Sequence, residues 1–265
     1  MLSFKNYVRV QSLDEAYQLC QKRNNIVLGG MLWLKMQDRN VNTVIDLCDL
    51  GLDQIEETEN EISIGAMVSL RTLETYEGLN ALTQGAVRES VKHIVGVQFR
   101  NVATIGGSIY GRFGFSDVLT MFMALDAKVE LYHTGILSIN DFSKLPRDQH
   151  DILVRVIVPK RNGRYTYFSM RNTATDFPVL TCAVSKTEDK VICSIGARPF
   201  KAKYYEDDKE ILTNGITMES ASAFANDIAN RATFGSNVRG GAEYRKRICE
   251  VLVRRAVLAL EEGRE

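Results

Sequence analysis

Apolar residues recur along the chain at spacings that predict short strands and helices. A capping box begins at Ser12 and predicts a short helix. It is followed by apolar strands at 26–28 and 44–47, with a helical turn at 32–36 between them. Together these elements predict a small βαβ-like unit within residues 1–55.

The pattern continues through two further regions. The middle of the chain predicts strands at 61–65, 128–132 and 151–158, the last ended by Pro159, and helices at 69–76, 87–95 and 118–124. The remainder predicts antiparallel strands at 165–170, 179–185 and 191–197, then helices at 218–231 and 243–261. The polar turn at 161–164 marks a predicted boundary. We therefore expect an α+β protein with one region at 1–162, divided into 1–55 and 56–162, and another at 163–265.

The composition mainly indicates which classes of protein and partner to exclude. Among 265 residues, 45% are hydrophobic, and 33 basic residues balance 33 acidic ones. This balance argues against nucleic acid as the main partner, because phosphate contacts need a basic surplus. No apolar run has the length that crosses a bilayer. The five cysteines are widely spaced, without CxxC pairs, and no secretory signal opens the chain, which favours reduced thiols in a cytoplasmic protein without a metal site.

Two glycine-rich stretches carry the strongest chemical signal, NNIVLGGMLWLKM (24–36) and RNVATIGGSIYGRFGFSD (100–117). Each is interpreted as an apolar strand, a Gly-Gly pair and a helix. Glycines let the backbone approach a ligand, and N–H groups at a helix start suit a phosphate. Two such loops could hold one diphosphate, although tight strand–helix turns would also explain the glycines. Neither stretch is a dinucleotide GxGxxG or a P-loop.

The second stretch, with SDVLTMFMALDAKVEL after it, resembles the second flavin-binding segment of the FAD subunit of molybdenum hydroxylases. That family includes xanthine dehydrogenase and carbon monoxide dehydrogenase. NNIVLGGMLWLKM and TVIDL are similar to its first, diphosphate-binding segment. TDFPVL (175–180) and VRGGAEYRKRICEVLVRRAV (238–257) resemble its later segments, so the similarity extends over nearly the whole chain.

The resemblance implies a fold and a function. Residues 1–162 would form a two-subdomain FAD-binding region of the PCMH/vanillyl-alcohol-oxidase-like type. Residues 163–265 would form the C-terminal domain of the carbon monoxide dehydrogenase flavoprotein, with a three-stranded antiparallel sheet and helices. The chain would take electrons from [2Fe–2S] clusters of a small partner subunit and pass them to NAD or another acceptor. A large molybdopterin-binding subunit would complete a xanthine dehydrogenase-like complex. No side chain is expected to act as a catalytic acid or base.

The resemblance also implies cofactor-binding residues. They are Val27, Leu28, Gly29, Gly30, Met31, Leu32, Ala103, Thr104, Gly106, Gly107, Ser108, Ser116, Asp117 and Phe177. The two glycine segments would hold the diphosphate through their backbone. Asp117 would accept hydrogen bonds from sugar or ribityl hydroxyls, and 177–180 would approach the isoalloxazine ring.

The first loop departs from the family pattern, because Met31-Leu32 replaces a hydroxyl and an acidic residue. A flavin-poor scaffold subunit is therefore the alternative function. Tyr110, Phe113 or Phe115 would stack on the flavin, or their loop would become ordered only in the complex.

The remaining polar and aromatic residues have no assigned chemistry. Trp33 is interpreted as a packing residue, with a flavin stack as the alternative. The residues interpreted as surface or structural are His93, His133 and His150, and those interpreted as solvated charges are Arg171 and Arg245-Lys246-Arg247. A subunit interface is the alternative for the last cluster.

Overall fold

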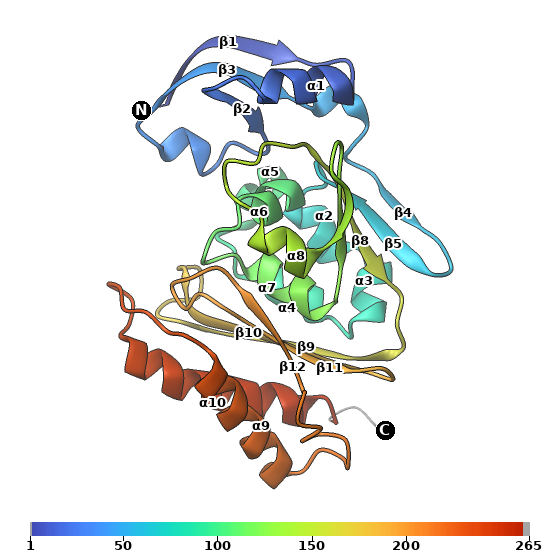
Figure 1. Cartoon of the computed structure of the whole chain (residues 1–265), viewed down its shortest axis with the longest axis vertical. Helices are drawn as coiled ribbons and strands as arrows, with labels where there is room; N and C mark the ends of the chain where they lie inside the picture. The colour runs from blue at the N-terminus through green and yellow to red at the C-terminus, as the bar shows by residue number, and fades with distance from the viewer. Residues whose placement is uncertain (1, 262–265) are drawn as a thin grey trace.

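The computed structural model describes residues 2–261 and arranges the chain as three regions along its long axis (Figure 1). The strands are β1 (Ser3–Arg9), β2 (Asn25–Leu28), β3 (Asn40–Asp46), β4 (Ile55–Glu57), β5 (Glu61–Gly65), β6 (Lys128–Leu131), β7 (Gly135–Ser138), β8 (Leu153–Pro159), β9 (Gly163–Arg171), β10 (Pro178–Thr187), β11 (Val191–Gly196) and β12 (Lys203–Glu206). The helices are α1 (Leu13–Cys20), α2 (Leu70–Thr75), α3 (Glu77–Leu82), α4 (Ala86–Lys92), α5 (Val97–Val102), α6 (Ile105–Tyr110), α7 (Asp117–Ala124), α8 (Ile139–Lys144), α9 (Met218–Arg231) and α10 (Ala242–Ala259), with short 3-10 helices η1 (Leu34–Met36) and η2 (Cys48–Leu50).

The N-terminal region is a parallel sheet with the strand order β1-β3-β2. Helix α1 connects β1 to β2, and its start is capped by the Ser12 hydroxyl, which accepts from the Glu15 N–H at 3.1 Å. The Glu15 carboxylate accepts from the N–H of Gln11 at 2.8 Å, one residue before the cap. Strand β1 was not predicted, because its first five residues are exposed and do not alternate between apolar and polar.

The middle region is an antiparallel sheet with the order β4-β5-β8-β6-β7, and helices α2 to α7 enter between β5 and β6. The predicted helix at 87–95 ends at Lys92, and two further helices, α5 and α6, occupy most of 97–110. Helix α7 is buried at each of its positions, so it forms the centre of this region rather than a surface helix.

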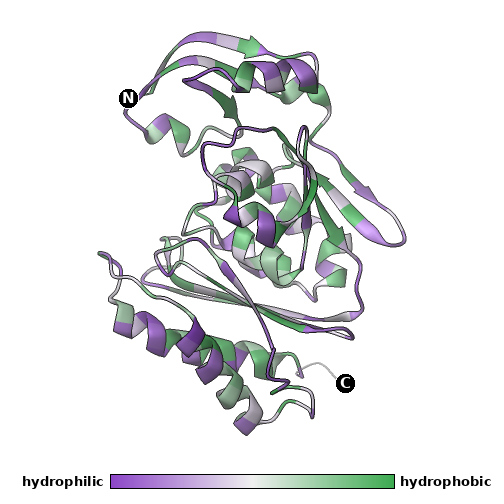
Figure 2. Ribbon diagram, viewed as in Figure 1, coloured by the Kyte–Doolittle hydropathy of each residue, from purple (hydrophilic) through white to green (hydrophobic). Residues whose placement is uncertain are grey.

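The C-terminal region is an antiparallel sheet with the order β12-β11-β10-β9. The three predicted strands are present, and β12 adds a fourth at the edge. Alternation along β10 divides its two faces: Leu180, Cys182 and Val184 pack toward α9 and α10, whereas Ala183 joins the core that contains α7. Figure 1 shows α9 and α10 below this sheet, and Figure 2 shows that α10 carries both hydrophilic and hydrophobic bands.

The predicted α+β class is confirmed, because helices and strands fill the chain in nearly the predicted order and two of the three sheets are antiparallel. The predicted division at residue 162 falls between the end of β8 and the start of β9 and stays a prediction. Tyr165 and Tyr167 of β9 belong to the same apolar core as α7, so packing crosses that point. Within residues 2–261, the helices are too short or too polar to cross a membrane.

Candidate cofactor-binding site

One cavity of about 560 Å³ is bordered by all three regions. Every residue that the resemblance assigns to the cofactor lines this cavity. Its volume lies in the range of roughly 300–1,000 Å³ that is usual for small-molecule and cofactor sites. The chain therefore brings the predicted residues together, while the role of each toward the cofactor stays a prediction.

The first glycine loop leaves β2 at Leu28 and turns through Met31, whose φ is +58°. No protein atom within residues 2–261 accepts a hydrogen bond from the backbone N–H groups of residues 29–33. Successive N–H groups beside a residue in the left-handed region form a concave anion site. A diphosphate can therefore bind to this backbone although Met31 has no hydroxyl group.

Close packing is a second reason for the glycines of this loop. A Cβ atom on Gly30 would lie 2.0 Å from the carbonyl oxygen of Val102, and one on Gly29 would lie 2.7 Å from Oγ1 of Thr104. The first loop thus packs directly on the second glycine segment. Close packing of the two segments therefore accounts for Gly29 and Gly30, while the approach of a ligand to this backbone stays a prediction.

The second glycine segment differs from its predicted form. Helix α5, not a strand, precedes it, and Gly106 and Gly107 lie in the first turn of α6. Thr104 caps that helix by accepting from the Gly107 N–H at 3.1 Å. A Cβ on Gly106 would lie 2.6 Å from the Ala66 carbonyl oxygen, whereas one on Gly107 would meet only Oγ1 of Thr104, at 3.3 Å. Gly107 is therefore the glycine of this segment with open space beside it.

The hydroxyl groups of Thr104, Ser108 and Ser116 differ in whether their protons are available to a ligand. Thr104 Oγ1 accepts a bond, so its own proton remains available for a ligand. Ser108 donates its proton to the Thr104 carbonyl oxygen at 3.0 Å. Ser116 donates to the Ser108 carbonyl oxygen at 2.8 Å and accepts from the Leu119 N–H at 3.1 Å, which caps α7. Among these three, Thr104 is the one best placed to donate to a phosphate oxygen.

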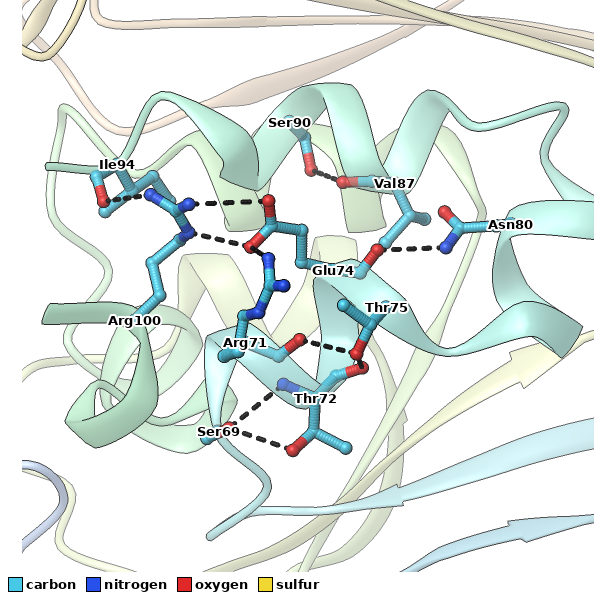
Figure 3. Close-up of polar contacts among 10 residues, drawn as sticks. All are labelled: Ser69, Arg71, Thr72, Glu74, Thr75, Asn80, Val87, Ser90, Ile94 and Arg100. Atoms are coloured by element: carbon cyan, nitrogen blue, oxygen red, sulfur yellow. Dashed lines mark hydrogen bonds and ion pairs between the residues drawn. The ribbon is translucent and has the colours of Figure 1, made fainter. Parts of the chain in front are cut away.

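A buried ion pair holds α5, the helix that precedes the second glycine segment (Figure 3). Arg100 of α5 donates to both carboxylate oxygens of Glu74 on α2, at 2.9 and 3.4 Å, and to the Ile94 carbonyl oxygen at 3.1 Å. Arg71 reaches the same carboxylate at 2.9 Å. Burial alone would raise the pKa of Glu74, but the hydrogen bonds from Arg71 and Arg100 outweigh it and the pKa is lowered. Arg100 thus anchors the helix that leads into the glycines.

Asp117 lies at the start of α7 and is 5% exposed. Its Oδ1 accepts from the Tyr167 hydroxyl at 2.5 Å and from the guanidinium of Arg171. Burial raises the pKa of Asp117, and Arg171 opposes that rise. The interpretation of Arg171 as a solvated charge is wrong, because its side chain is 7% exposed and is the countercharge of Asp117 at the cavity wall.

Arg245 also corrects the sequence interpretation. Its side chain is fully buried. The guanidinium group loses its contact with water but donates instead to the carbonyl oxygens of Val179 and Gly235 and to the Asn237 side chain. Lys246 and Arg247 are exposed, as expected. A buried arginine cannot be told from a solvated one by its position on a predicted helix, because carbonyl acceptors leave no mark in the sequence.

Histidines were interpreted as surface or structural, and two of them, His93 and His150, line the cavity. Burial is the largest cause that lowers the pKa of His93. The cavity also includes two arginines that sequence reasoning did not single out, Arg39 and Arg147. Neither belongs to a motif, so the sequence carried no signal for them.

Three aromatic rings form a wall of the cavity, which we call the aromatic wall: Trp33, Phe115 and Phe177. Their ring centroids are 5.2 Å apart for Trp33 and Phe115, 5.1 Å for Trp33 and Phe177, and 4.5 Å for Phe115 and Phe177. Each ring comes from a different region of the chain. Phe113 stacks on Phe115 at 5.2 Å. Trp33 therefore packs on other aromatic rings, and because it does so at the cavity, the alternative of a flavin stack stays a prediction.

Tyr110 has a structural role in this arrangement. Its hydroxyl accepts from the Asp151 N–H at 3.0 Å and donates to the Gln149 carbonyl oxygen at 3.4 Å. Burial raises its pKa. The side chain thus ties the end of α6 to the segment before β8.

Comparison with known proteins agrees with this geometry. A family model described as the FAD binding domain in molybdopterin dehydrogenase matches residues 2–161. The chain belongs to this family. FAD is therefore its cofactor, and the chain is a component of an oxidoreductase.

Relatives of known name are similar over almost their full length. The carbon monoxide dehydrogenase medium chain of Afipia carboxidovorans is 27% identical over 281 residues, which cover 95% of both chains. The glyceraldehyde dehydrogenase medium chain of Sulfolobus acidocaldarius is 24% identical over 273 residues, covering 95% of this chain and 96% of that one. A solved carbon monoxide dehydrogenase from Hydrogenophaga pseudoflava matches with a TM-score of 0.85 at 22% identity, over 96% of each chain. At that identity the structural likeness shows the fold.

Proposed function

We propose that this flavin subunit is the electron-transfer subunit of a xanthine dehydrogenase-like molybdenum hydroxylase. It takes electrons from the [2Fe–2S] clusters of a small subunit, beside a large molybdopterin-binding subunit, and passes them to NAD or another acceptor. The observation that carries the proposal is the single cavity that gathers both glycine segments, Asp117 and Phe177. The medium-chain relatives support the partner subunits. Cytoplasmic location is proposed with it, supported by cysteines that remain free thiols.

Different residues of the cavity bind different parts of FAD. The N–H groups of residues 29–33 donate to the diphosphate, and the Thr104 hydroxyl adds a hydrogen bond from the opposite side. Asp117, held by Arg171 and Tyr167, accepts from a sugar or ribityl hydroxyl. The residues that approach the isoalloxazine ring are those of the aromatic wall, because Phe177 belongs to the segment that the resemblance places there.

FAD supplies the redox chemistry when bound, since a flavin accepts electrons singly and releases a pair as hydride. The chain contributes position and exclusion of water. Arg171 balances the charge of Asp117 inside the cavity, so the carboxylate is held there without an exposed counterion. The apolar rings of the aromatic wall keep water from the adjoining part of the cavity.

The visible spectrum of the purified chain, with the released cofactor identified after denaturation, tests the proposal. We expect stoichiometric FAD, because the backbone donors of the first loop are preserved. Uptake of FAD only with the partner subunits would mean that the loop at 110–115 is ordered by assembly. A colourless chain that takes up no FAD, alone or with its partners, would contradict the proposal and favour the flavin-poor scaffold suggested by Met31-Leu32.

A further inference from the structure

The C-terminal motif VRGGAEYR (238–245) has no role in the function described so far. Its last residue, Arg245, is fully buried and forms no ion pair within residues 2–261. Its Nε donates to the Val179 carbonyl oxygen at 3.1 Å, and its two terminal nitrogens donate to Gly235 O at 3.4 Å and to Asn237 Oδ1 at 2.6 Å. Arg245 therefore joins the start of α10 to β10 and to the turn before α10.

Asn237 continues this chain of contacts. Its Oδ1 also accepts from the backbone N–H of Arg239 at 3.0 Å. The turn is closed by two backbone bonds between Asn237 and Gly240, at 3.1 and 3.2 Å. The backbone of Arg239 is thus held by a side chain that is itself held by buried Arg245.

The side chain of Arg239 lies against the cavity wall. Its guanidinium carbon is 4.7 Å from the ring centroid of Phe177, and its Nη2 is 3.2 Å from Oδ1 of Asp176. A cation at this distance from an aromatic face is attracted to it. Phe177 in turn contacts Phe115 and Trp33, so Arg239 supports the aromatic wall from outside.

We propose that Arg239, fixed by Asn237 and Arg245, is a positioning residue that holds Phe177 in the aromatic wall and so preorganises the flavin end of the cavity. The inference rests on the proposed function and deepens it, since it assigns the C-terminal motif to the cofactor site. Arg239 acts through Phe177 and is not expected to touch the reacting atoms. Loss of its support would leave Phe177 free to leave the wall, so binding of FAD would first require the ring to be ordered again.

The full-length chain offers a natural probe, because Trp33 is its single tryptophan and belongs to the wall. In Arg239→Met we expect acrylamide to quench Trp33 emission about twofold more efficiently than in the wild type, before any FAD is added. We expect at least about threefold weaker FAD binding, the size that loss of a cation–π contact and a partly buried ion pair predicts. The rise in the dissociation constant of FAD should come mainly from faster FAD dissociation.

Two further variants and a control variant separate positioning from general stability. Arg239→Lys retains a cation and should restore most of the FAD affinity and the low quenching. Asn237→Ala should resemble Arg239→Met, and the two changes should not add, because they interrupt one chain of contacts. Arg247→Met is the matched control, since Arg247 is exposed on α10, which follows the turn that contains Arg239, and has no hydrogen-bond or ion-pair partner within residues 2–261.

The outcomes distinguish this inference from the proposed function. Unchanged quenching and unchanged FAD rates in Arg239→Met would overturn the positioning role while leaving FAD binding intact. Equal effects of Arg239→Met and Arg247→Met would also overturn it. A wild-type chain that binds no FAD would instead contradict the proposed function, and Trp33 quenching would still report whether Arg239 holds the wall.

Discussion

Gly30 and Gly107 line the same cavity but have different surroundings. A Cβ on Gly30 would lie 2.0 Å from the Val102 carbonyl oxygen, which is backbone and cannot move aside cheaply. A Cβ on Gly107 would meet only the Thr104 side chain, at 3.3 Å. Gly30 is therefore required by packing, whereas packing alone does not require a glycine at position 107.

This contrast predicts different results for two alanine variants. Gly30→Ala should lower both FAD affinity and the free energy of unfolding, the latter by about 1–3 kcal/mol because the loop must shift. Gly107→Ala should leave unfolding unchanged or raise its free energy by up to about 1 kcal/mol, since alanine is the better helix former. It should still weaken FAD binding, because the methyl group enters the cavity. Urea unfolding and FAD titration measure both quantities. Wild-type FAD affinity in Gly107→Ala would show that the ligand does not approach this glycine.

Residue positions in the site were predictable to an unequal degree. Thr104, Gly106, Gly107 and Asp117 belong to one contiguous segment, so the sequence alone predicted that they lie at one site. Arg171 was missed because its partner Asp117 is far away along the chain, and only the packing of β9 on α7 brings the two charges together. Arg239 and Phe177 were missed as a pair for the same reason.

Among the elements, α2 and α5 are joined by the buried pair of Glu74 and Arg100, and this pair predicts a pH effect. The pKa of Glu74 is lowered from 4.5 in the folded chain. Its contribution to stability is therefore present above 4.5 and is lost as the pH falls through the lower, folded-state pKa. Glu74→Gln should reduce the free energy of unfolding at neutral pH by about 3 kcal/mol, because Arg100 stays buried without its countercharge.

The same variant should also flatten the acid side of the stability profile. Urea unfolding between neutral and acidic pH measures this, and the loss should shrink toward low pH. Glu89→Gln is the control, since Glu89 forms an exposed pair with Lys92 and its removal should cost less than about 1 kcal/mol. A Glu74→Gln profile parallel to that of the wild type would show that the carboxylate does not titrate differently on folding.

Strands and helices were predictable where burial gives the sequence a regular pattern of apolar residues, and they were missed where it gives none. Strand β5 alternates and strands β8, β10 and β11 are mostly buried, so the sequence pattern of each predicted a strand. Strand β1 is almost entirely exposed and is held by pairing with β3, a partner that no local pattern reveals. Helix α6 contains two glycines with low helix propensity, and its form depends on backbone bonds to residues 66 and 68.

At the scale of the whole molecule, the middle and C-terminal regions share a core. Thr120 of α7 bonds to Thr181 of β10 at 2.9 Å, and Ser185 donates to the Ala124 carbonyl oxygen at 2.6 Å. The N-terminal sheet has two small apolar clusters of its own, and these include Ile152 from the middle region but no residue of the C-terminal sheet. We therefore infer two units of unequal stability, with the cavity between them.

This inference predicts the order of unfolding. Without FAD, Trp33 emission, which reports the first loop, should change at a lower urea concentration than far-UV circular dichroism, which reports the larger unit. Saturating FAD contacts both units and adds about 2.7 kcal/mol at one hundred times its Kd, so the two transitions should move up and converge. Coincident transitions without FAD would show that the N-terminal sheet has no separate stability. Transitions that stay apart with FAD bound would show that the ligand does not bridge the two glycine segments.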